Sequence, residues 1–319
     1  MSDVVSLGSA NVDRTRYLDT ESIRALESRY DWFPAAGETV RVEESPSLPT
    51  LEDDAYRNVV GGKGANQAVA AARGGADSAF LGCVGTDHTE YGVLETLADR
   101  GVDVGGVRTA DCETGKAYVF VDDTGESWIG IVDGANEAVD PDYARGQYDR
   151  ILAADVLLLQ NEIPVATMDA VLARLADESE RPTVICNPAP ADGAAPLLER
   201  ATIDIVVVNQ TEFAALEDAL QSFDGTIVRT QGGDEVVISG TRSYRLTPPA
   251  ADPVDTTGAG DVFCGYLAAM LADGAPIERA ADVATTAGSI ATETEGVQTA
   301  IPTREMVFDA LENGPASTV

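Results

Sequence analysis

The residues with the clearest chemical promise form the string Asp-Thr-Thr-Gly-Ala-Gly-Asp at 255–261, which runs directly into an apolar helical pattern. The small residues Gly258, Ala259 and Gly260 let the backbone approach a ligand closely. The helix that follows presents unpaired N–H groups and a positive dipole end, which attract an anion. Asp261 could take a proton from a hydroxyl group beside that anion, so the string suits phosphoryl transfer to an alcohol. The alternative is that Asp261 only caps the helix.

A second glycine-rich turn, Gly-Gly-Lys-Gly-Ala-Asn-Gln at 61–67, also opens a helical pattern. It is not a Walker A loop, because no Ser or Thr follows its lysine, and it lacks the third glycine of the dinucleotide fingerprint. Lys63 and Asn66 can donate to hydroxyl or anionic oxygens. The alternative is a flexible turn with a solvated lysine. The chain has only two lysines, Lys63 and Lys116, and this scarcity favours a functional role for Lys63.

Polar residues also follow several apolar runs. Asn11 and Asp13 follow the first run, Glu162 ends a later one, and Asn209 and Glu212 follow another. In wound α/β sheets, ligands bind at the carboxyl ends of the strands. Each pattern has a structural alternative, namely an Asx turn at the first run and a helix N-cap box for Asn209 with Glu212. The residues alone leave both interpretations open.

The composition excludes several classes of partner and chemistry. Asp and Glu number 54 against 21 Lys and Arg, a net charge of −33. Such a surface repels nucleic-acid phosphates and anionic lipids, so we expect neither nucleic acid nor membrane as a partner. Acidity spread along the chain with almost no lysine predicts a halophilic protein, an ordinary acidic protein being the alternative. A single histidine, His88, excludes Ser-His-Asp, Cys-His and multi-histidine metal sites.

The cysteines and the N-terminal segment predict a cytoplasmic protein. Cys83, Cys112, Cys186 and Cys264 are far apart in the sequence, and we expect them to be buried and reduced. The first residues lack the basic and apolar segments of a signal peptide, and no stretch approaches the ~20 apolar residues of a membrane span.

Short apolar runs alternate with helical patterns along most of the chain. Strands are predicted at residues 4–9, 78–85, 156–162, 183–190 and 203–209, and helices at 64–73, 89–100, 166–178 and 258–272. The strands are apolar on both faces, as in a parallel sheet that is covered on both sides. The alternation predicts an α/β fold with a doubly wound, mostly parallel sheet.

Two segments depart from this alternation. Residues 113–133 contain two strand patterns around a short turn, which predicts an antiparallel hairpin. Residues 14–60 are polar, acidic and irregular, with one strand candidate in Gly-Glu-Thr-Val-Arg-Val. We therefore predict a small β-sheet lid from 14–60 and 113–133. It is inserted into an α/β core of residues 1–13, 61–112 and 134–319.

Taken together, these strings resemble the PfkB sugar-kinase family, and most of all its ribokinase-like members. GSANVD, PAAGETV, GGKGANQAVAAARGGA, WIGIVDGAN, NPAP, NQTE and VDTTGAGDVFCGYL occur in the family's order across nearly the whole chain. The resemblance implies an ATP-dependent kinase that phosphorylates the primary hydroxyl of a furanose sugar, with D-ribose to D-ribose 5-phosphate as the first expectation. It also implies Mg²⁺ bound with ATP, and a homodimer formed through the lid.

The resemblance assigns roles to individual positions. It implies that Asp261 is the catalytic base and that the backbone of Gly258, Ala259 and Gly260 is the anion hole. The sugar hydroxyls would contact Asn11, Asp13, Gly62, Lys63, Asn66, Glu162 and Asp261. ATP would contact Asn209, Thr230, Gly232, Gly233 and Gly260. Asn209 and Glu212 would order Mg²⁺ through water, and Asp255, Thr257, Ala291 and Gly296 would line a monovalent-cation site.

Some features leave the substrate and the ions open. Ala300 stands where the family usually has Ser near the cation, which leaves K⁺ activation open. The segment 14–60 is longer than expected, which leaves lid closure, dimerisation and the exact sugar open. Four of the arginines within it, Arg14, Arg16, Arg41 and Arg57, keep a sugar-phosphate kinase open. The sequence is also compatible with a fructokinase, with a nucleoside kinase and, from a different class, with a non-catalytic sugar sensor.

Overall fold

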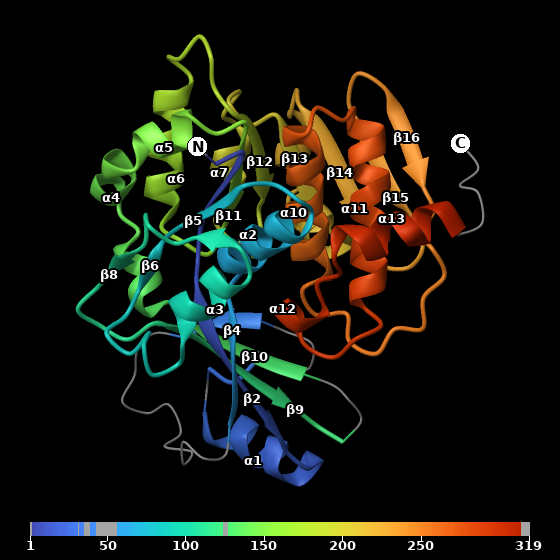
Figure 1. The fold of residues 1–319 in the computed structure, drawn as a ribbon. Helices are drawn as coiled ribbons and strands as arrows, with labels where there is room; N and C mark the ends of the chain where they lie inside the picture. Colours follow the sequence, from blue (N-terminus) through green and yellow to red (C-terminus); the bar gives the residue numbers. More distant parts are fainter. Residues whose placement is uncertain (1, 31, 35–38, 43–55, 124–126, 314–319) are drawn as a thin grey trace.

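The computed structural model describes residues 2–30, 32–34, 39–42, 56–123 and 127–313, and its largest element is a nine-stranded sheet (Figure 1). The strand order is β16-β15-β14-β13-β12-β11-β1-β5-β7. The bounds are β1 Val4–Leu7, β5 Ser78–Leu81, β7 Val102–Asp103, β11 Val156–Gln160, β12 Thr183–Asn187, β13 Ile205–Val208, β14 Thr226–Thr230, β15 Val236–Ser239 and β16 Ser243–Leu246. Neighbours from β7 to β14 pair in parallel, and β15 and β16 add an antiparallel edge.

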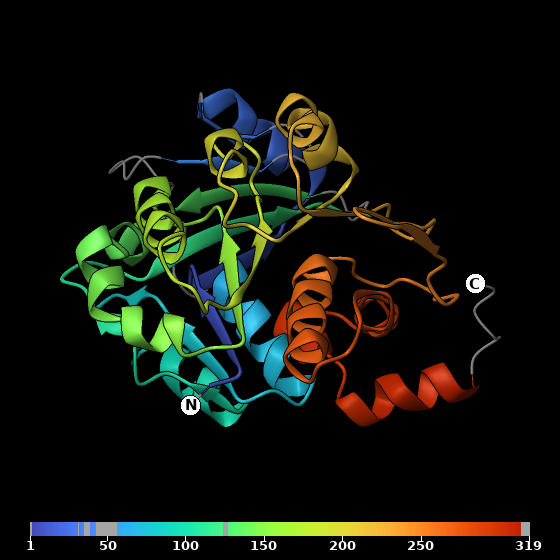
Figure 2. The same cartoon turned by 90° about the horizontal axis from the view of Figure 1, so that it is seen from above.

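Helices cover both faces of this sheet (Figure 2). Alternate side chains of each strand enter two separate cores: Val4 of β1 packs into one, and Val5 and Leu7 pack into the other. The first core contains α2 (Lys63–Arg73), α3 (Val93–Asp99), α10 (Ala259–Ala272), α11 (Ile277–Ala291), α12 (Val297–Ala300) and α13 (Arg304–Asn313). The second contains α4 (Pro141–Gly146), α5 (Tyr148–Leu152), α6 (Val165–Leu175), α7 (Ala195–Leu198), α8 (Gln210–Ala215) and α9 (Glu217–Gln221). The predicted doubly wound α/β fold is therefore confirmed.

A five-stranded second sheet stands off one end of the core (Figure 1). Its order is β3 (Thr39–Arg41), β10 (Ser127–Val132), β9 (Gly115–Val121), β2 (Asn11–Tyr17) and β4 (Arg57–Gly61). The helix α1 (Thr20–Arg29) packs on it through Ile23, next to Phe120 and Trp128. In this sheet, β2 begins at Asn11 and β4 ends at Gly61, so the sheet includes a few residues that we assigned to the core. The division of the chain into core and lid units stays a prediction.

Three local expectations were wrong. Residues 14–60 are not irregular throughout, because they contain the helix α1. Asp19 caps this helix by accepting a hydrogen bond from the Ser22 N–H. The strand predicted at 78–85 is split between β5 and β6 (Cys83–Val84), and β6 pairs with β8 (Arg108–Thr109) in a separate small sheet. The helix predicted at 89–100 is shorter, because α3 begins only after Gly92, whose φ is +63°.

Other outcomes concern the termini of elements and the cysteines. The turn of the predicted 113–133 hairpin lies outside the described residues, but β9 and β10 pair antiparallel around it. A short 3₁₀ helix, η2 (Gly134–Ala138), follows β10. All four cysteines are free, and Cys112 is partly exposed rather than buried as expected. Among the described residues, no helix is long and apolar enough to cross a bilayer.

Candidate active site

Asp261 lies in the first turn of α10 and is only 5% exposed. Its two carboxylate oxygens accept hydrogen bonds from consecutive side chains of α2. Asn66 Nδ2 donates to Oδ2 at 3.1 Å, and Gln67 Nε2 donates to Oδ1 at 3.0 Å. These donors come from another helix, so the carboxylate does not serve as a local cap of α10. The helix start holds an oriented, hydrogen-bonded carboxylate next to its own first-turn backbone N–H groups, of which that of Ala259 donates to the Thr256 carbonyl oxygen at 3.3 Å.

The start of α10 opens onto a polar pocket of about 150 Å³. Gly258, the N-cap of α10, has φ +79°, a left-handed conformation that favours glycine. A Cβ at Gly260 would meet no atom within 4 Å, so the space above this backbone is free for a ligand. The pocket is lined by Lys63, Asn187, Val207, Val208, Asn209, Glu212, Thr230, Gly258, Gly260 and Asp261. It thus joins the glycine-rich turn to the carboxyl ends of β12, β13 and β14.

The glycine-rich turn packs tightly against the segment that follows β1. Gly62, the N-cap of α2, has φ +91°. A Cβ at Gly64 would lie 2.6 Å from the backbone nitrogen of Ser9, and a Cβ at Gly61 would lie 2.0 Å from an Asp13 carboxylate oxygen. These glycines therefore allow two backbones to meet. The meeting places Lys63 beside the predicted sugar-binding residues.

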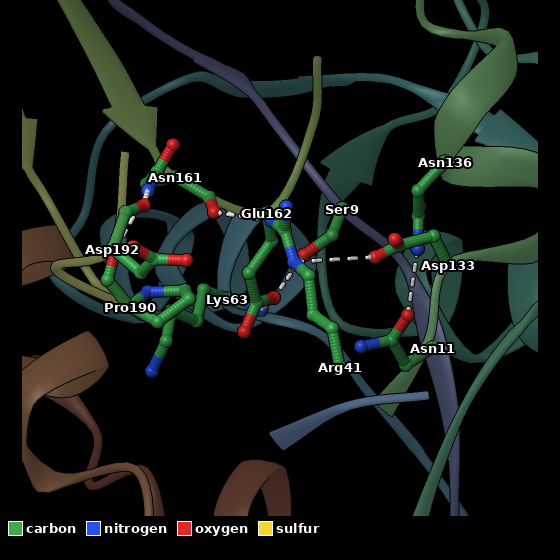
Figure 3. A network of polar contacts seen from close by, with 10 residues as sticks. All are labelled: Ser9, Asn11, Arg41, Lys63, Asp133, Asn136, Asn161, Glu162, Pro190 and Asp192. Carbon is green, nitrogen blue, oxygen red and sulfur yellow. Dashed lines mark hydrogen bonds and ion pairs between the residues drawn. The ribbon is translucent and has the colours of Figure 1, made fainter. Parts of the chain in front are cut away.

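Figure 3 shows a polar network around Lys63 and Glu162. Glu162 Oε2 accepts from Ser9 Oγ at 2.5 Å and from the Lys63 backbone N–H at 3.1 Å. On the other side, Asn136 Nδ2 donates to Asn11 Oδ1 at 2.8 Å. The sequence-predicted residues Asn11, Lys63 and Glu162 are thus brought together with two residues, Ser9 and Asn136, to which we had assigned no role.

Arg41 of β3 belongs to this network, although the sequence marked it only as one of several lid arginines. Its Nη2 donates to the carbonyl oxygen of Asn161 at 2.7 Å, and its Nε lies 3.7 Å from Asp133 Oδ1 (Figure 3). A lid strand therefore reaches the residue next to Glu162. No local pattern around Arg41 indicated this, because the contact joins residues 120 positions apart.

The charges of the site influence one another. Burial alone would lower the pKa of Lys63, but the carboxylates of Asp261, Glu162 and Glu212 raise it above its ordinary value. Lys63 is therefore a cation under all working conditions. Burial raises the pKa of Asp13 from 3.8 to about 7, with Glu162 and Asp261 adding to the effect and Lys63 opposing it.

The raised pKa of Asp13 predicts a pH-dependent cost to stability. The folded protein holds this proton more tightly than the unfolded chain, so ionised Asp13 lowers the free energy of unfolding increasingly as the pH rises to about 7. We expect Asp13→Asn to stabilise the protein, with a gain at about pH 8 that exceeds the gain at about pH 5.5 by ~1–2 kcal/mol. Denaturant unfolding at both pH values measures it. Asp309→Asn, at an exposed aspartate, is the control, and an equal gain at both pH values would contradict the prediction.

Asn209 and Glu212 form a complete capping box at the start of α8. Asn209 Oδ1 accepts from the Glu212 N–H at 2.8 Å, and Glu212 Oε2 accepts from the Asn209 N–H at 2.9 Å. The N-cap box that the sequence offered as the structural alternative for Asn209 and Glu212 is therefore observed. Both residues also line the pocket, and burial raises the pKa of Glu212. Capping fixes their position, and one Glu212 oxygen stays available toward a ligand.

The predicted nucleotide turn is only partly at the pocket. Thr230, the last residue of β14, lines it, whereas Gly232 and Gly233 are exposed and do not. Gly232 has φ +62°, as a tight turn requires. The two glycines of the turn therefore lie outside the lining of this pocket, and only Thr230 belongs to it.

The residues of the predicted monovalent-cation site come together from two segments. Asp255 Oδ1 accepts from the Thr257 N–H at 2.9 Å, and Oδ2 accepts from the Gly296 N–H at 3.0 Å. Burial opposes ionisation of Asp255, yet these hydrogen bonds lower its pKa. Ala291 ends α11 close by, and Ala300 is buried. Within the described residues, no group of three His, Cys, Asp or Glu side chains is arranged to hold a metal ion.

Comparison with known proteins shows what this chain is similar to. The model of the pfkB family of carbohydrate kinases matches residues 35–304. Bacillus subtilis ribokinase is 36% identical over 88% of this chain and 94% of its own length. An ATP-dependent ribose-1-phosphate kinase from Halopiger xanaduensis is 35% identical over 84% and 92%. The structure of Arabidopsis thaliana ribokinase with ribose and ATP has a TM-score of 0.77, 27% identity, and coverage of 98% and 99%. The chain belongs to the pfkB family of carbohydrate kinases, which are phosphotransferases with an alcohol group as acceptor.

Proposed function

We propose that this kinase uses ATP to phosphorylate the primary hydroxyl of a furanose sugar, with D-ribose to D-ribose 5-phosphate as the reaction. The observation that carries the proposal is the position of Asp261. Its carboxylate is buried, oriented by two amides, and lines one pocket together with Lys63 and the backbone at the start of α10. A sugar hydroxyl beside Asp261 and a phosphoryl group over Gly258–Asp261 would then meet in line.

In this proposal, each group has one task. The hydroxyl oxygen attacks the γ-phosphorus, its proton passes to Asp261, and the bond from the γ-phosphorus to the β-phosphate oxygen breaks to release ADP. The backbone N–H groups of Gly258 and Gly260 stabilise the charge on the transferred group, and the Ala259 N–H joins them once it leaves the Thr256 carbonyl oxygen, to which it donates at 3.3 Å in the structure. Asn11, Asp13, Lys63, Asn66 and Glu162 would hold the sugar hydroxyls, and Gly62 would let the backbone approach them.

The pocket also suits the ions that such a reaction uses. Glu212 and Asn209 offer oxygens at the pocket wall that fit waters of Mg²⁺ bound to ATP, and Mg²⁺ would neutralise phosphate charge there. Thr230, Gly232 and Gly233 would border the nucleotide. At the loop of Asp255 and Thr257, both Asp255 oxygens already accept N–H groups, so K⁺ would depend on carbonyls there and near Ala291 and Gly296.

The charge of the sugar site supports a neutral sugar. Asp13, Glu162 and Asp261 surround the proposed sugar position, and Lys63 and Arg41 are the cations described near them. A sugar that carries a phosphate would add repulsion to this acidic set. Two other lid arginines are engaged elsewhere: Arg14 stacks on Tyr56, and Arg57 lies 3.9 Å from Glu295.

A phosphorylated pentose is the second candidate, because the Halopiger relative is named a ribose-1-phosphate kinase and Arg41 reaches the site. Fructose and nucleosides are further candidate substrates within the family. A non-catalytic sugar sensor is disfavoured by the complete arrangement around Asp261.

A coupled assay of ADP release distinguishes these candidates. The substrates are ribose, ribose 1-phosphate, fructose, fructose phosphates, deoxyribose and nucleosides, each in concentrated KCl. We expect the highest kcat/KM with ribose and no turnover with 5-deoxyribose, which lacks the primary hydroxyl. A preference for ribose 1-phosphate would favour the second candidate. Absence of any sugar-dependent turnover would favour the sensor.

We also propose that the protein is halophilic and that it pairs through the lid. Lid pairing is supported by β3 and β4, which end the order of the second sheet, so that no further strand of the described residues pairs with either edge. The mass of the protein in solution, by light scattering, tests it, and a monomer would refute it.

The net charge of −33 predicts a strong dependence of stability on salt. The Debye length grows from roughly 3 Å in molar salt to about 10 Å at ~0.1 M, so repulsion among the carboxylates extends across the surface when salt is removed. We expect the melting temperature to fall steeply on dialysis from molar KCl to ~0.1 M KCl. Sucrose added at low salt is the control for general exclusion effects. An unchanged melting temperature would refute the halophilic assignment.

A further inference from the structure

Two amide side chains outside the proposed sugar contacts determine how the site presents its hydrogen-bonding groups. They are Asn136 of η2 and Gln298 of α12, each 1% exposed. Asn136 contacts Asn11, and Gln298 contacts Asn66. We refer to Asn136 and Gln298 as the locking amides. The sequence assigned no role to either of them.

Asn136 has only one possible orientation. Its Oδ1 accepts from the backbone N–H of Ala10 at 3.0 Å, and a backbone N–H can only donate. The Nδ2 of Asn136 must therefore face Asn11, where it donates to Oδ1 at 2.8 Å. As a result, Asn11 turns its own nitrogen away from Asn136, toward the side on which Lys63 and Glu162 lie (Figure 3).

Gln298 is held by the same logic from a different donor. Arg100 Nη1 donates to Gln298 Oε1, and a guanidinium has no acceptor. Gln298 Nε2 must then face Asn66, where it donates to Oδ1 at 2.8 Å. Asn66 in turn presents its Nδ2 to Asp261, at 3.1 Å. A donor-only group at one end thus sets the polarity of a buried chain that ends on Asp261.

We propose that Asn136 and Gln298 are positioning residues that lock Asn11 and Asn66 as hydrogen-bond donors. The inference rests on the proposed function, because Asn11 and Asn66 are taken to contact the sugar. A locked donor costs no reorganisation when a sugar hydroxyl arrives, whereas a free amide could equally present its oxygen. Asn66 also donates to Asp261, so its lock bears on the chemical step as well as on binding.

Replacing a locking amide by the corresponding acid should reverse the orientation of the amide to which it is hydrogen-bonded. In Asn136→Asp, the Ala10 N–H is still satisfied, but the other oxygen faces Asn11, which must then donate to it and turn its oxygen to the sugar. In Gln298→Glu, Arg100 is still satisfied, and Asn66 turns its oxygen toward Asp261. Both substitutions keep the volume of the side chain, and the donors of Ala10 and Arg100 keep their hydrogen-bond acceptors.

The two variants should differ in kinetics. We expect Asn136→Asp to raise the sugar KM about ten- to hundredfold with little change in kcat. The reason is that Asn11 is assigned to sugar binding and not to the support of Asp261. We expect Gln298→Glu to raise KM similarly and to lower kcat by roughly tenfold or more, because Asp261 loses a donor. Gln221→Glu, at an exposed residue, is the control for the added charge. Wild-type KM in both acid variants would overturn the proposal.

Neutral variants separate a lock from simple packing. Asn136→Leu and Gln298→Met remove the lock without reversing it, so their KM values should lie between those of the wild type and of the acid variants. If the residues only fill space, the apolar variants should equal the wild type in KM and kcat, and the acid variants should differ from it only in melting temperature. That result would also overturn the proposal.

A stability cycle tests the lock without any sugar. Gln298→Glu reverses the direction of the hydrogen bonds that run from Arg100 to Asp261. Asp261→Asn then supplies an N–H group that donates to the oxygen of the reversed Asn66. The double variant should therefore unfold at higher denaturant than the two single effects predict. In an Asn66→Leu background, the carboxylate introduced by Gln298→Glu and that of Asp261 still repel each other directly, but no amide connects them. The coupling free energy between Gln298→Glu and Asp261→Asn should therefore be smaller. Unchanged coupling would overturn the lock, whereas absent sugar turnover in the wild type would refute only the proposed function.

Discussion

Replacing Asp261 by Asn is expected to lower kcat by roughly 10²- to 10⁴-fold, the usual range for loss of a general base. The amide has nearly the same shape, but it cannot take the proton of the attacking hydroxyl. Steady-state ADP release at saturating sugar and ATP measures the effect. Calorimetric binding of the sugar and of a non-hydrolysable ATP analogue should weaken far less than kcat falls, since the sugar contacts other than Asp261 stay in place.

The structure sharpens this prediction against the helix-cap alternative. A residue that only caps α10 would tolerate Asn, because Asn serves nearly as well as Asp at a helix start. In the structure, the carboxylate instead accepts from Asn66 and Gln67, which belong to α2. Asp252→Asn, at an exposed aspartate before the motif, is the matched control. A kcat for Asp261→Asn within about tenfold of the wild type would remove Asp261 from the role of base.

The sequence could predict those parts of the site whose signal is local. Gly258 and Gly62 sit at helix starts with positive φ, and short glycine-rich strings before apolar helical patterns indicate such starts directly. Lys63 stood out because lysine is so scarce in this chain. Each of these residues stands in a short string whose composition is itself the signal, so a local pattern was sufficient to single it out.

Residues whose role depends on distant partners left no such signal. Gln298 and Asn66 are 232 positions apart, and Asn136 and Asn11 are 125 apart. A glutamine or asparagine next to a polar residue, as Asn136 is to Glu137 and Gln298 is to Thr299, is equally compatible with an exposed turn, and only the fold shows that it is buried and has one orientation. Ser9 and Arg41 were missed for the same reason.

Outside the site as well, elements with a local sequence signal were predictable, whereas features that depend on distant contacts were not. The central strands were predictable because they are apolar on both faces. Helix α1 was missed because only Ile23 is buried in it, so it has no continuous apolar stripe. At the break between β5 and β6, the backbone of Gly82 is closely surrounded: a Cβ there would lie 2.5 Å from the Phe80 ring and 2.7 Å from the Gly8 carbonyl oxygen. That crowding exists only in the assembled sheet.

Lys63→Met is expected to lower kcat by roughly 10²- to 10³-fold, the cost of losing one strong group that stabilises charge in the transition state. The sequence assigned Lys63 to the sugar alone. In the structure, it also lines the pocket over Gly258 and Gly260, next to Asp261. It is therefore placed to balance negative charge on the phosphoryl group during transfer, and we expect the sugar KM to rise together with the loss of kcat.

A second consequence of Lys63→Met separates this electrostatic role from a structural one. Lys63 lowers the pKa of Asp13, which burial holds at about 7. Without the cation, that pKa should rise further, so the gain in stability from Asp13→Asn at about pH 8 should be larger in a Lys63→Met background. Arg145→Met removes an exposed positive charge of an i,i+3 ion pair and is the control. If kcat fell equally in the control, loss of net charge would explain the effect. If Lys63→Met lowered only the melting temperature, Lys63 would be structural, because a cation that balances the phosphoryl group must act on turnover in the folded enzyme.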